Sequence, residues 1–220
     1  LRPVLDAIGG GAHRVSEIGG RIGRPATSMA RPLKRLVEMG LVRRETPFGE
    51  PPRSSRRSLY KIDDPFVRLW FRTVAPNRAQ LASSTTAGRR RLFKHGWGGL
   101  LAEAWEDLCR LRVPQTTSAG AAAWGPAQRW WRGGLPEWDV VSESEDGKRL
   151  LLGEAKWSAK PFGRTKLGHA LRGIRSKPTP LLPARFDRHE VVRALFLPAL
   201  APGTSTPDDV ELVTVGHLVP

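Results

Sequence analysis

Acidic and basic side chains flank an Asp146-Gly147 dipeptide in the second half of the chain. Glu137 and Asp139 lie before it in the run EWDVVSE, and Glu154 and Lys156 lie after it in the run RLLLGEAKWS. Both runs are short and apolar-rich, as strands are. Asp-Gly is a preferred dipeptide for the two-residue type I′ turn of a hairpin. The pattern therefore predicts a β-hairpin with two acids on one strand and an acid and a lysine on the other.

The expected turn fixes which residues of the two strands face each other. The predicted pairs are Val141 with Leu152, Asp139 with Glu154, and Glu137 with Lys156. Because side chains alternate along a strand, the four charged residues project from one face. Directly opposed Cβ atoms lie about 4.5–5.5 Å apart. At that separation Asp139 and Glu154 can share one hard cation, Mg²⁺ or Mn²⁺.

Two opposed carboxylates are unfavourable unless something compensates their charge. They repel each other and cost free energy on burial, so simple packing does not favour the pairing. A divalent cation would reverse the sign of the interaction, and Lys156 would then hold a water or a phosphate oxygen. The alternative is a solvated polar face with a Glu137–Lys156 ion pair, and a bulge in either strand would also break the register. From spacing alone both interpretations stay open.

The elements around this hairpin predict an α/β domain with a mixed sheet. A helical stripe over residues 92–112 comprises Phe93, Trp97, Leu101, Trp105, Leu108 and Leu111. Glu106 lies beside that stripe. Strand-like runs follow at 121–131, 137–143 and 149–158, then a helix at 167–176, then strands at 191–199 and 210–219. This order, a helix followed by strands and a second helix, is typical of an α/β layout.

The first third of the chain predicts three short helices followed by a hairpin. Apolar stripes mark the helices, at Val4, Leu5 and Ile8, at Ile18 and Ile22, and at Met29, Leu33, Leu36 and Val37. We expect Ser16 to cap the second helix and Gly40 to end the third. Pro32 suits only a first helical turn, so the third helix, expected from about Ala26 to Met39, can begin as late as Thr27 or Ser28. Helix, helix, helix, hairpin is the winged helix-turn-helix order.

Basic residues accompany this order. Arg31, Lys34 and Arg35 lie on the polar side of the third helix, and Arg53, Arg56 and Arg57 lie in or beside the Pro/Gly/Ser-rich loop 49–55 between the strands. In such modules the third helix enters the major groove while wing arginines reach phosphates or the minor groove. The alternative is a winged helix used only for protein contacts.

The segment after the hairpin has two parts. Phe66, Leu69, Trp70 and Val74 have helical spacing and predict a buried apolar face, with Asp63 or Asp64 as the helix cap. Residues 82–91 are small, polar and basic, and predict a loop. We therefore expect a winged-helix domain over 1–75, a linker over 76–91 and an α/β domain over 92–220.

The composition favours a polyanionic partner. The net charge is +15 and the pI is about 11.3, with the basic excess densest in the first third. Arginine-rich codon usage is the alternative source of this charge. The single cysteine, Cys109, lies in a helical pattern between apolar residues and is expected in the core. Neither a membrane span nor a signal peptide is indicated, so a cytoplasmic protein is expected.

An acid on one strand, E-x-K on the next and a glutamate on a preceding helix resemble the PD-(D/E)xK nuclease superfamily, which includes restriction endonucleases. The succession YKIDDPFVRLWFRTVAPN, AWEDLCR, RWW…EWDVV and LLGEAKW is similar to a narrower family, the C-terminal region of archaeal-type AAA ATPases. There an ATPase domain precedes a winged helix and a nuclease-like domain of unknown function. The resemblance covers about residues 1 to 200.

The resemblance implies a role for each matching residue. Asp139 and Glu154 match the metal-binding acids, Lys156 matches the lysine that positions the attacking water or offsets charge, and Glu106 matches the acid on the preceding helix. The chain departs from the superfamily in two places. Trp138 precedes Asp139 where the superfamily has proline, and the metal face has no histidine or second acid beyond Glu137.

The expected function is Mg²⁺- or Mn²⁺-dependent hydrolysis of phosphodiester bonds, with double-stranded DNA as partner. The fold expected with it is a winged helix-turn-helix followed by a restriction-endonuclease-like mixed sheet. The chain lacks a GxxxxGK[ST] loop and opens at Leu1 in a helical pattern, so we expect a fragment whose ATPase domain lies in preceding sequence. A homodimer is expected by analogy with enzymes that cut two strands. The alternatives are a non-catalytic DNA-binding or regulatory module of the ATPase and a protein-interaction adaptor.

Overall fold

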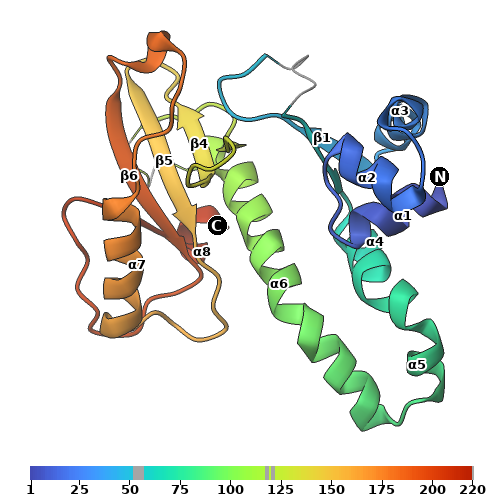
Figure 1. Ribbon diagram of the computed structural model, residues 1–220. Coiled ribbons are helices and arrows are strands. Elements are labelled where there is room, and N and C mark those ends of the chain that lie inside the picture. Colours follow the sequence, from blue (N-terminus) through green and yellow to red (C-terminus); the bar gives the residue numbers. More distant parts are fainter. Residues whose placement is uncertain (52–56, 117–118, 120–121, 220) are drawn as a thin grey trace. The chain divides into compact units, whose positions relative to one another are not determined.

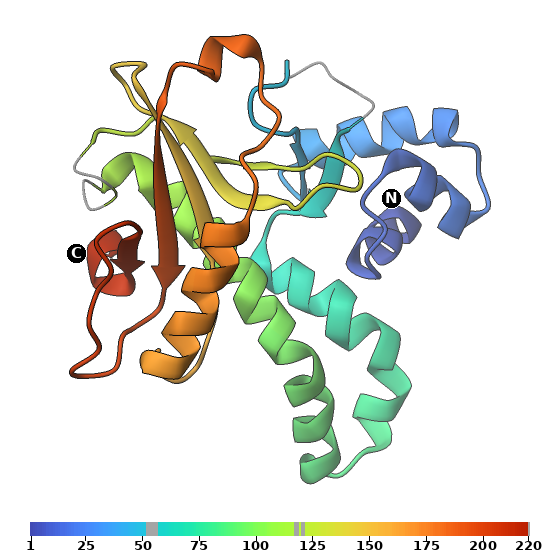
Figure 2. The ribbon, with the colours of Figure 1, turned by 60° about the vertical axis from the view of Figure 1, so that its left-hand side comes forward.

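The computed structural model, shown in Figures 1 and 2, describes residues 1–51, 57–116, 119 and 122–219 and divides into two compact units. The first, here the helical unit, comprises Leu1–Thr46 and Pro52–Leu100. The second, here the sheet unit, comprises Pro47–Pro51 and Leu101–Pro220.

The helical unit opens with three helices and a two-stranded antiparallel hairpin, in the predicted order. The elements are α1 (Arg2–Gly9), α2 (Val15–Ile22), the 3₁₀ turn η1 (Ala26–Met29), α3 (Ala30–Glu38), β1 (Val42–Glu45) and β2 (Leu59–Ile62). In the hairpin Val42 pairs with Ile62 and Glu45 with Leu59. Apolar residues of all three helices and both strands form one core, which includes Ile8, Ile18 and Leu36.

The third helix shows why its sequence tolerates a proline. A 3₁₀ turn precedes α3, so Pro32 lies in the first turn of α3, where a missing N–H breaks no helical hydrogen bond. Gly40 has a φ of +68° and ends the helix as predicted. Val37 differs from the prediction, because it is 39% exposed while Leu33 and Leu36 are buried.

The second helix is capped differently from the prediction. Ser16 lies inside α2, which begins at Val15. The Glu17 carboxylate instead accepts hydrogen bonds from the N–H groups of His13 (2.9 Å) and Arg14 (3.0 Å). The negative charge of this carboxylate also interacts favourably with the positive N-terminal end of the helix dipole. Glu17 therefore stabilises the start of α2, the role expected of Ser16.

The segment after the hairpin is helical but not a regular α-helix. Its elements are α4 (Pro65–Leu69), the π-helical turn η2 (Trp70–Val74), the 3₁₀ turn η3 (Ala75–Asn77) and α5 (Arg78–Ser83). The Asp64 side chain caps α4 by accepting from the Val67 N–H at 2.7 Å, as predicted. The expected apolar face is wrong, because Phe66 is 70% and Trp70 36% exposed while Arg68 and Thr73 are buried. Val67 and Phe71, each one position after an expected residue, pack against the core of the helical unit instead.

Residues 82–91, expected as a loop, are largely helical. Helix α6 (Thr86–Arg112) spans 27 residues and already contains Arg89, Arg90 and Arg91. Ala, Arg, Leu and Lys are strong helix formers, and the Thr85 hydroxyl accepts from the Gly88 N–H at 3.2 Å where the helix begins. Within the described ranges, no helix is long and apolar enough to cross a membrane.

The sheet unit contains a mixed five-stranded sheet, which confirms the predicted α/β class. Its elements from Val113 on are the 3₁₀ turn η4 (Val113–Gln115), β3 (Gln128–Trp130), β4 (Trp138–Glu143), β5 (Arg149–Ala155), α7 (Arg164–Ser176), the 3₁₀ turn η5 (Ala184–Phe186), β6 (Glu190–Leu197), β7 (Glu211–Thr214) and α8 (Val215–Leu218). The strand order is β3-β4-β5-β6-β7. Pairs β3–β4 and β4–β5 are antiparallel, whereas β5–β6 and β6–β7 are parallel. Residues 215–218, expected in a strand, form α8.

Two helices cover opposite faces of this sheet (Figures 1 and 2). Leu150 and Leu152 of β5 pack in the cluster that contains α7, whereas Leu151 packs in the cluster that contains the C-terminal half of α6. Cys109 lies in the second cluster, fully buried, so its predicted place in the core is confirmed. Leu111, expected in the same stripe, is 67% exposed.

Five residues from the loop between β1 and β2 belong to the sheet unit. Phe48 lies in the α7-side core, where its ring is 5.3 Å from that of Phe186, and its N–H donates to the Arg129 carbonyl at 2.8 Å. The described start of this loop is therefore structured by packing, which its Pro/Gly/Ser content did not indicate.

Gly153 of β5 is required by close packing. A Cβ at this position would lie 2.6 Å from the Phe196 ring and 2.9 Å from the Val140 Cβ, both in the buried core. We expect Gly153→Ala to lower the free energy of unfolding by about 1–3 kcal/mol, the usual cost of overpacking. Gly173→Ala in α7, where a Cβ meets nothing within 4 Å, should raise it by about 0.5–1 kcal/mol. Urea denaturation of both variants checks this, and equal effects would contradict the packing argument.

Candidate active site

The β4–β5 hairpin has the predicted register. Val141 pairs with Leu152 and Val140 with Gly153, so continuing the ladder sets Asp139 opposite Glu154. This places the two carboxylates at the end of the hairpin away from its turn.

The turn itself differs from the predicted type I′ form. The Gly147 N–H donates to the Ser144 carbonyl at 2.9 Å, which centres the turn on Glu145 and Asp146. Gly147 has a φ of +67°, and the Ser144 N–H bonds to the Arg149 carbonyl at 3.0 Å. The connection is thus a four-residue loop. It adds one residue to each side of the two-residue turn, so the strands stay in the predicted register.

Asp139 is held in a partly buried position by main-chain contacts. Its carboxylate accepts the Ala155 N–H at 3.0 Å, and its carbonyl accepts from Arg110 Nη1 at 2.8 Å. Burial, together with the negative charges of Glu154 and Glu106, raises the pKa of Asp139 to about 7. Asp139 is therefore a buried acid whose charged form is disfavoured first by burial and then by two neighbouring acids.

Glu154 is neutralised by two lysines. Lys156 Nζ donates to one carboxylate oxygen at 2.8 Å, and Lys177 Nζ donates to the other. Burial alone would raise the pKa of Glu154, but the two lysines hold it below its usual value. Burial opposes the charge of Lys156 too, yet the Glu154 hydrogen bond keeps the pKa of Lys156 above its usual value.

Glu106 joins this cluster from helix α6. Its carboxylate lies 3.9 Å from Arg110 Nη1, one helical turn on, and its charge acts on both Asp139 and Lys156. The structure thus brings together Glu106, Asp139, Glu154 and Lys156.

Glu137 lies apart from this cluster, which corrects the expected Glu137–Lys156 pair. Its side chain is 53% exposed and accepts from Arg129 Nη2 at 2.8 Å. β4 begins only at Trp138, so Glu137 is outside the ladder that aligns the other residues.

Three residues near the acids were missed from sequence. Lys177 follows the end of α7, His169 lies within α7, and Arg110 lies four residues after Glu106. Glu154, Lys156, Lys177 and His169 line one cavity of about 390 Å³. The i, i+4 spacing could have identified Arg110, whereas no local pattern connects Lys177 to Glu154 across 23 positions.

Trp138 fixes Lys177 in place. The Trp138 indole N–H donates to the Pro178 carbonyl at 3.1 Å, and the Lys177 ammonium lies 4.7 Å from the centre of the Trp138 ring. Trp138 is fully buried, so it is a fixed support for this cation.

The donor set suits a hard divalent cation with few protein ligands. Mg²⁺ commonly binds through one or two carboxylates and keeps water or substrate oxygens in its other positions. Asp139 and Glu154 provide that pair, and a cation would offset the burial and the neighbouring negative charges that raise the pKa of Asp139. Over the part of the chain that the structure describes, no group of three or more Asp, Glu, His or Cys side chains is arranged to hold a metal by itself.

The basic residues predicted to contact DNA are only partly described. Arg31, Lys34 and Arg35 are exposed on α3, opposite the buried Leu33 and Leu36, and Lys34 lies 3.7 Å from Glu38. Arg57 is half-buried just before β2. Arg53 and Arg56 lie outside the described residues.

Comparisons with known proteins place the candidate acids in a recognised but functionally undefined segment. Residues 70–167 match the model of a family described as archaeal and bacterial proteins of unknown function. An uncharacterized protein of Methanocaldococcus jannaschii is 25% identical over 158 residues, which are 71% of this chain and 35% of that protein. The chain therefore spans about a third of that curated relative.

One solved structure, that of the SdaI restriction endonuclease, is similar over 84% of this chain and 70% of that chain, at 15% identity and a TM-score of 0.22. A TM-score this low does not define a common fold. The evidence for the mixed sheet and its register therefore comes from the structure of this chain alone.

The raised pKa of Asp139 makes a stability prediction for the metal-free protein. The folded state binds the Asp139 proton more tightly than the unfolded state does. The contribution of protonated Asp139 to the free energy of unfolding is therefore fully present below about pH 4 and is lost as the pH rises to about 7. Asp139→Asn carries no charge at any pH. Between pH 4 and 7 the free energy of unfolding of Asp139→Asn, compared with that of the native protein, should therefore rise by roughly 3–4 kcal/mol.

Urea denaturation in EDTA at several pH values measures this difference. Glu137→Gln is the matched control, since it removes an exposed acid near the same strand and should show no such trend. A difference between Asp139→Asn and the native protein that stays constant with pH would contradict the assignment of Asp139 as a strained buried acid.

Proposed function

We propose that the sheet unit hydrolyses phosphodiester bonds in DNA with the help of Mg²⁺ or Mn²⁺. The observation that supports this most is the cluster of Glu106, Asp139 and Glu154, three acids gathered beside Lys156 at the end of the β4–β5 hairpin. Burying like charges together costs free energy, so a cluster of this kind is a candidate for a functional site. The PD-(D/E)xK resemblance assigns the same four residues to a nuclease site, on a restriction-endonuclease-like fold.

Each residue has a role in this proposal. A bound divalent cation would supply Lewis-acid polarisation of a phosphate oxygen and of water. Asp139 and Glu154 hold that cation, and Glu106 adds negative charge on the α6 side. Lys156 orients the attacking water or offsets the charge that develops on the phosphate. The cavity beside α7, with Lys177 and His169 on its wall, accepts the substrate backbone.

The helical unit would hold the DNA. Its three helices and hairpin have the order of a winged helix-turn-helix, and α3 presents Arg31, Lys34 and Arg35 on its exposed face. An exposed basic helix of this kind suits the major groove and its flanking phosphates. Arg53, Arg56 and Arg57 of the wing complete the proposed contact.

The proposal also includes an ATPase domain preceding this chain, and a homodimer as the active form. The ATPase rests on the family resemblance. The homodimer rests on the need of a duplex-cutting enzyme to reach two strands.

A non-catalytic DNA-binding module is the second candidate, and one observation favours it. Both oxygens of Glu154 are bound by lysines, so the protein neutralises this acid without a metal. In such a site the acids and lysines would have the arrangement of a nuclease site but would only stabilise the fold, as an ion-pair network.

Loss of cleavage in acid variants is the first test. We expect Asp139→Asn and Glu154→Gln to lower Mn²⁺-dependent nicking of plasmid DNA at least about 100-fold, because each removes a metal ligand. Glu137→Gln removes the same charge from an acid outside the cluster and should leave nicking unchanged. Undiminished nicking by Asp139→Asn would refute the site.

Thermal unfolding with and without Mn²⁺ separates the two candidates. A functional carboxylate pair binds the ion in the folded state only and raises the Tm, and Asp139→Asn abolishes the shift. No nicking and no Tm shift in the native chain would exclude the metal-dependent nuclease and favour a non-catalytic module.

Salt-dependent binding tests the helical unit. Arg35→Gln should weaken binding to duplex DNA and reduce the slope of log K against log salt by about one, as expected for one lost phosphate contact. Arg188→Gln, an exposed arginine of the sheet unit, is the charge-matched control and should keep the native slope. The measurement is fluorescence anisotropy over a series of salt concentrations, and identical slopes for the two variants would contradict α3 as the DNA contact.

A further inference from the structure

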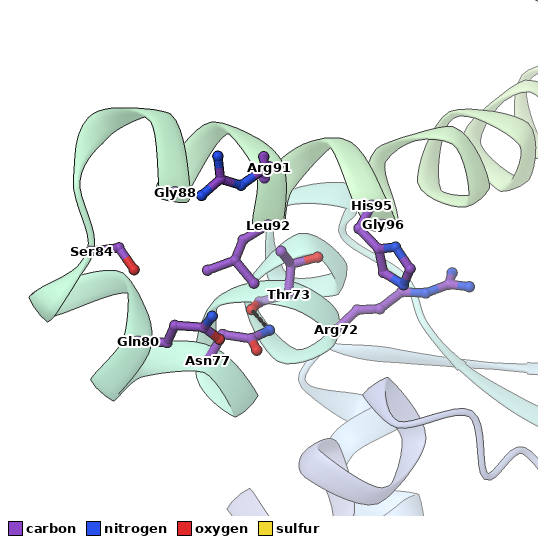
Figure 3. Close-up of a pocket in the computed structure, with 10 residues that line it drawn as sticks. All are labelled: Arg72, Thr73, Asn77, Gln80, Ser84, Gly88, Arg91, Leu92, His95 and Gly96. Atoms are coloured by element: carbon purple, nitrogen blue, oxygen red, sulfur yellow. Dashed lines mark hydrogen bonds between the residues drawn. The ribbon is translucent and has the colours of Figure 1, made fainter.

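Charged side chains converge on the cavity beside α7 in the sheet unit. A cavity of about 340 Å³ in the helical unit, between η2–α5 and the N-terminal half of α6, differs in this respect, because Leu92 lies between its polar side chains (Figure 3). The cavity beside α7, of about 390 Å³, brings together Glu154, Lys156 and Lys177. Its electrostatics therefore depend on how the two lysines share one carboxylate.

The two lysines differ in how firmly they are held. The Lys156 side chain is 46% exposed, whereas that of Lys177 is 13% exposed. The Lys177 ammonium also lies 4.7 Å from the centre of the buried Trp138 ring, whose indole N–H donates to the carbonyl of Pro178, the residue after Lys177. Lys156 can therefore turn into solvent more easily than Lys177, which would lose an aromatic partner as well as the carboxylate.

Lys177 also restricts the geometry at Glu154. Lys156 donates to one Glu154 oxygen and Lys177 to the other. The charges of Asp139 and Glu106 act on Lys156, which places Lys156 on the side of Glu154 that faces these acids. Lys156 is therefore the group that yields its oxygen to a cation held by Asp139 and Glu154, while Lys177 keeps the other oxygen. A second ion about 3.5–4 Å from the first, as in two-ion sites, would have to displace Lys177.

The formal charges of the cluster show the effect of a lysine that stays in place. Arg110 Nη2 lies 2.5 Å from the Asp107 carboxylate, so these two charges offset each other. The three acids of the cluster carry three negative charges when ionised, and Lys177 reduces the sum to two. Once Lys156 has turned away, a single divalent cation neutralises that sum.

We propose that Lys177 is a built-in cation that limits the acid cluster to one divalent ion and lowers the affinity of the cluster for that ion. The inference rests on the proposed function, because it takes the cluster to be a metal site. Lys177 acts through Glu154 and through its charge, so it is a positioning residue. Lys156 is then left to orient the attacking water or to contact the phosphate.

Binding of Mn²⁺ to the full 220-residue chain is the first test, with the free ion measured by its EPR signal. We expect one ion per native chain. Lys177→Met should lower the Kd for Mn²⁺ about tenfold, because it removes a positive charge beside the ion. Lys177→Gln keeps a donor for Glu154 without the charge and should tighten binding similarly, whereas Lys177→Arg keeps the charge and should bind as the native chain does.

An exposed lysine of the sheet unit provides the matched control. Lys160→Met removes the same charge outside the cavity and should change the Kd less than about twofold. Thermal unfolding separates the proposed role from a structural one. In EDTA, Lys177→Met should lower the Tm, since Glu154 loses a partner, but saturating Mn²⁺ should raise the Tm of this variant more than that of the native chain. A lysine that only stabilised the fold would lower the Tm equally with and without Mn²⁺.

The outcomes distinguish this inference from the proposed function. Equal or weaker Mn²⁺ binding by Lys177→Met and Lys177→Gln, while Asp139→Asn abolishes binding, would overturn the role of Lys177 and leave the metal site intact. Binding by neither the native chain nor the Lys177 variants would refute the metal site and this inference together. Binding by the Lys177→Met and Lys177→Gln variants alone would support Lys177 as the cation that opposes the ion, and would refute the proposed function of the native chain.

Discussion

Two carboxylates held opposite each other at the end of a hairpin dominate the electrostatics of the sheet unit. Like charges at this distance destabilise the fold unless cations compensate them. The chain compensates Glu154 with Lys156 and Lys177, while Asp139 receives a main-chain N–H but also the negative charge of Glu106. The charge of Glu154 is therefore better compensated than that of Asp139. A bound cation would stabilise the fold most by its interaction with Asp139.

The geometry of these acids was predictable because it is local. The residues that set the register lie within one hairpin. The register was right although the turn type was wrong, because the four-residue loop adds one residue to each side of the predicted two-residue turn. Glu106 was found through a family resemblance, and the structure places its charge beside Asp139.

The features that sequence did not reveal depend on distant contacts or on irregular backbone. Lys177 reaches Glu154 only because the turn after α7 is fixed to the sheet, and Phe48 enters a core built from residues more than about 80 positions away, from Trp130 onward. The exposed Phe66 and Trp70 were misassigned because apolar residues occupy two adjacent faces of this segment, and the face that packs on the core is that of Val67 and Phe71. The loop expected at 82–91 is helical because helix-forming residues outweigh its polar composition.

Trp138 occupies the position before Asp139, where the PD-(D/E)xK pattern that the sequence resembles has proline. A proline there would offer neither an indole N–H for the Pro178 carbonyl nor an aromatic face for the Lys177 ammonium. The tryptophan and the second lysine on Glu154 therefore form one structural unit, in which the indole supports the ammonium. Among relatives of this chain the two positions should co-vary, with the lysine retained where the tryptophan is present and free to change where a proline replaces it.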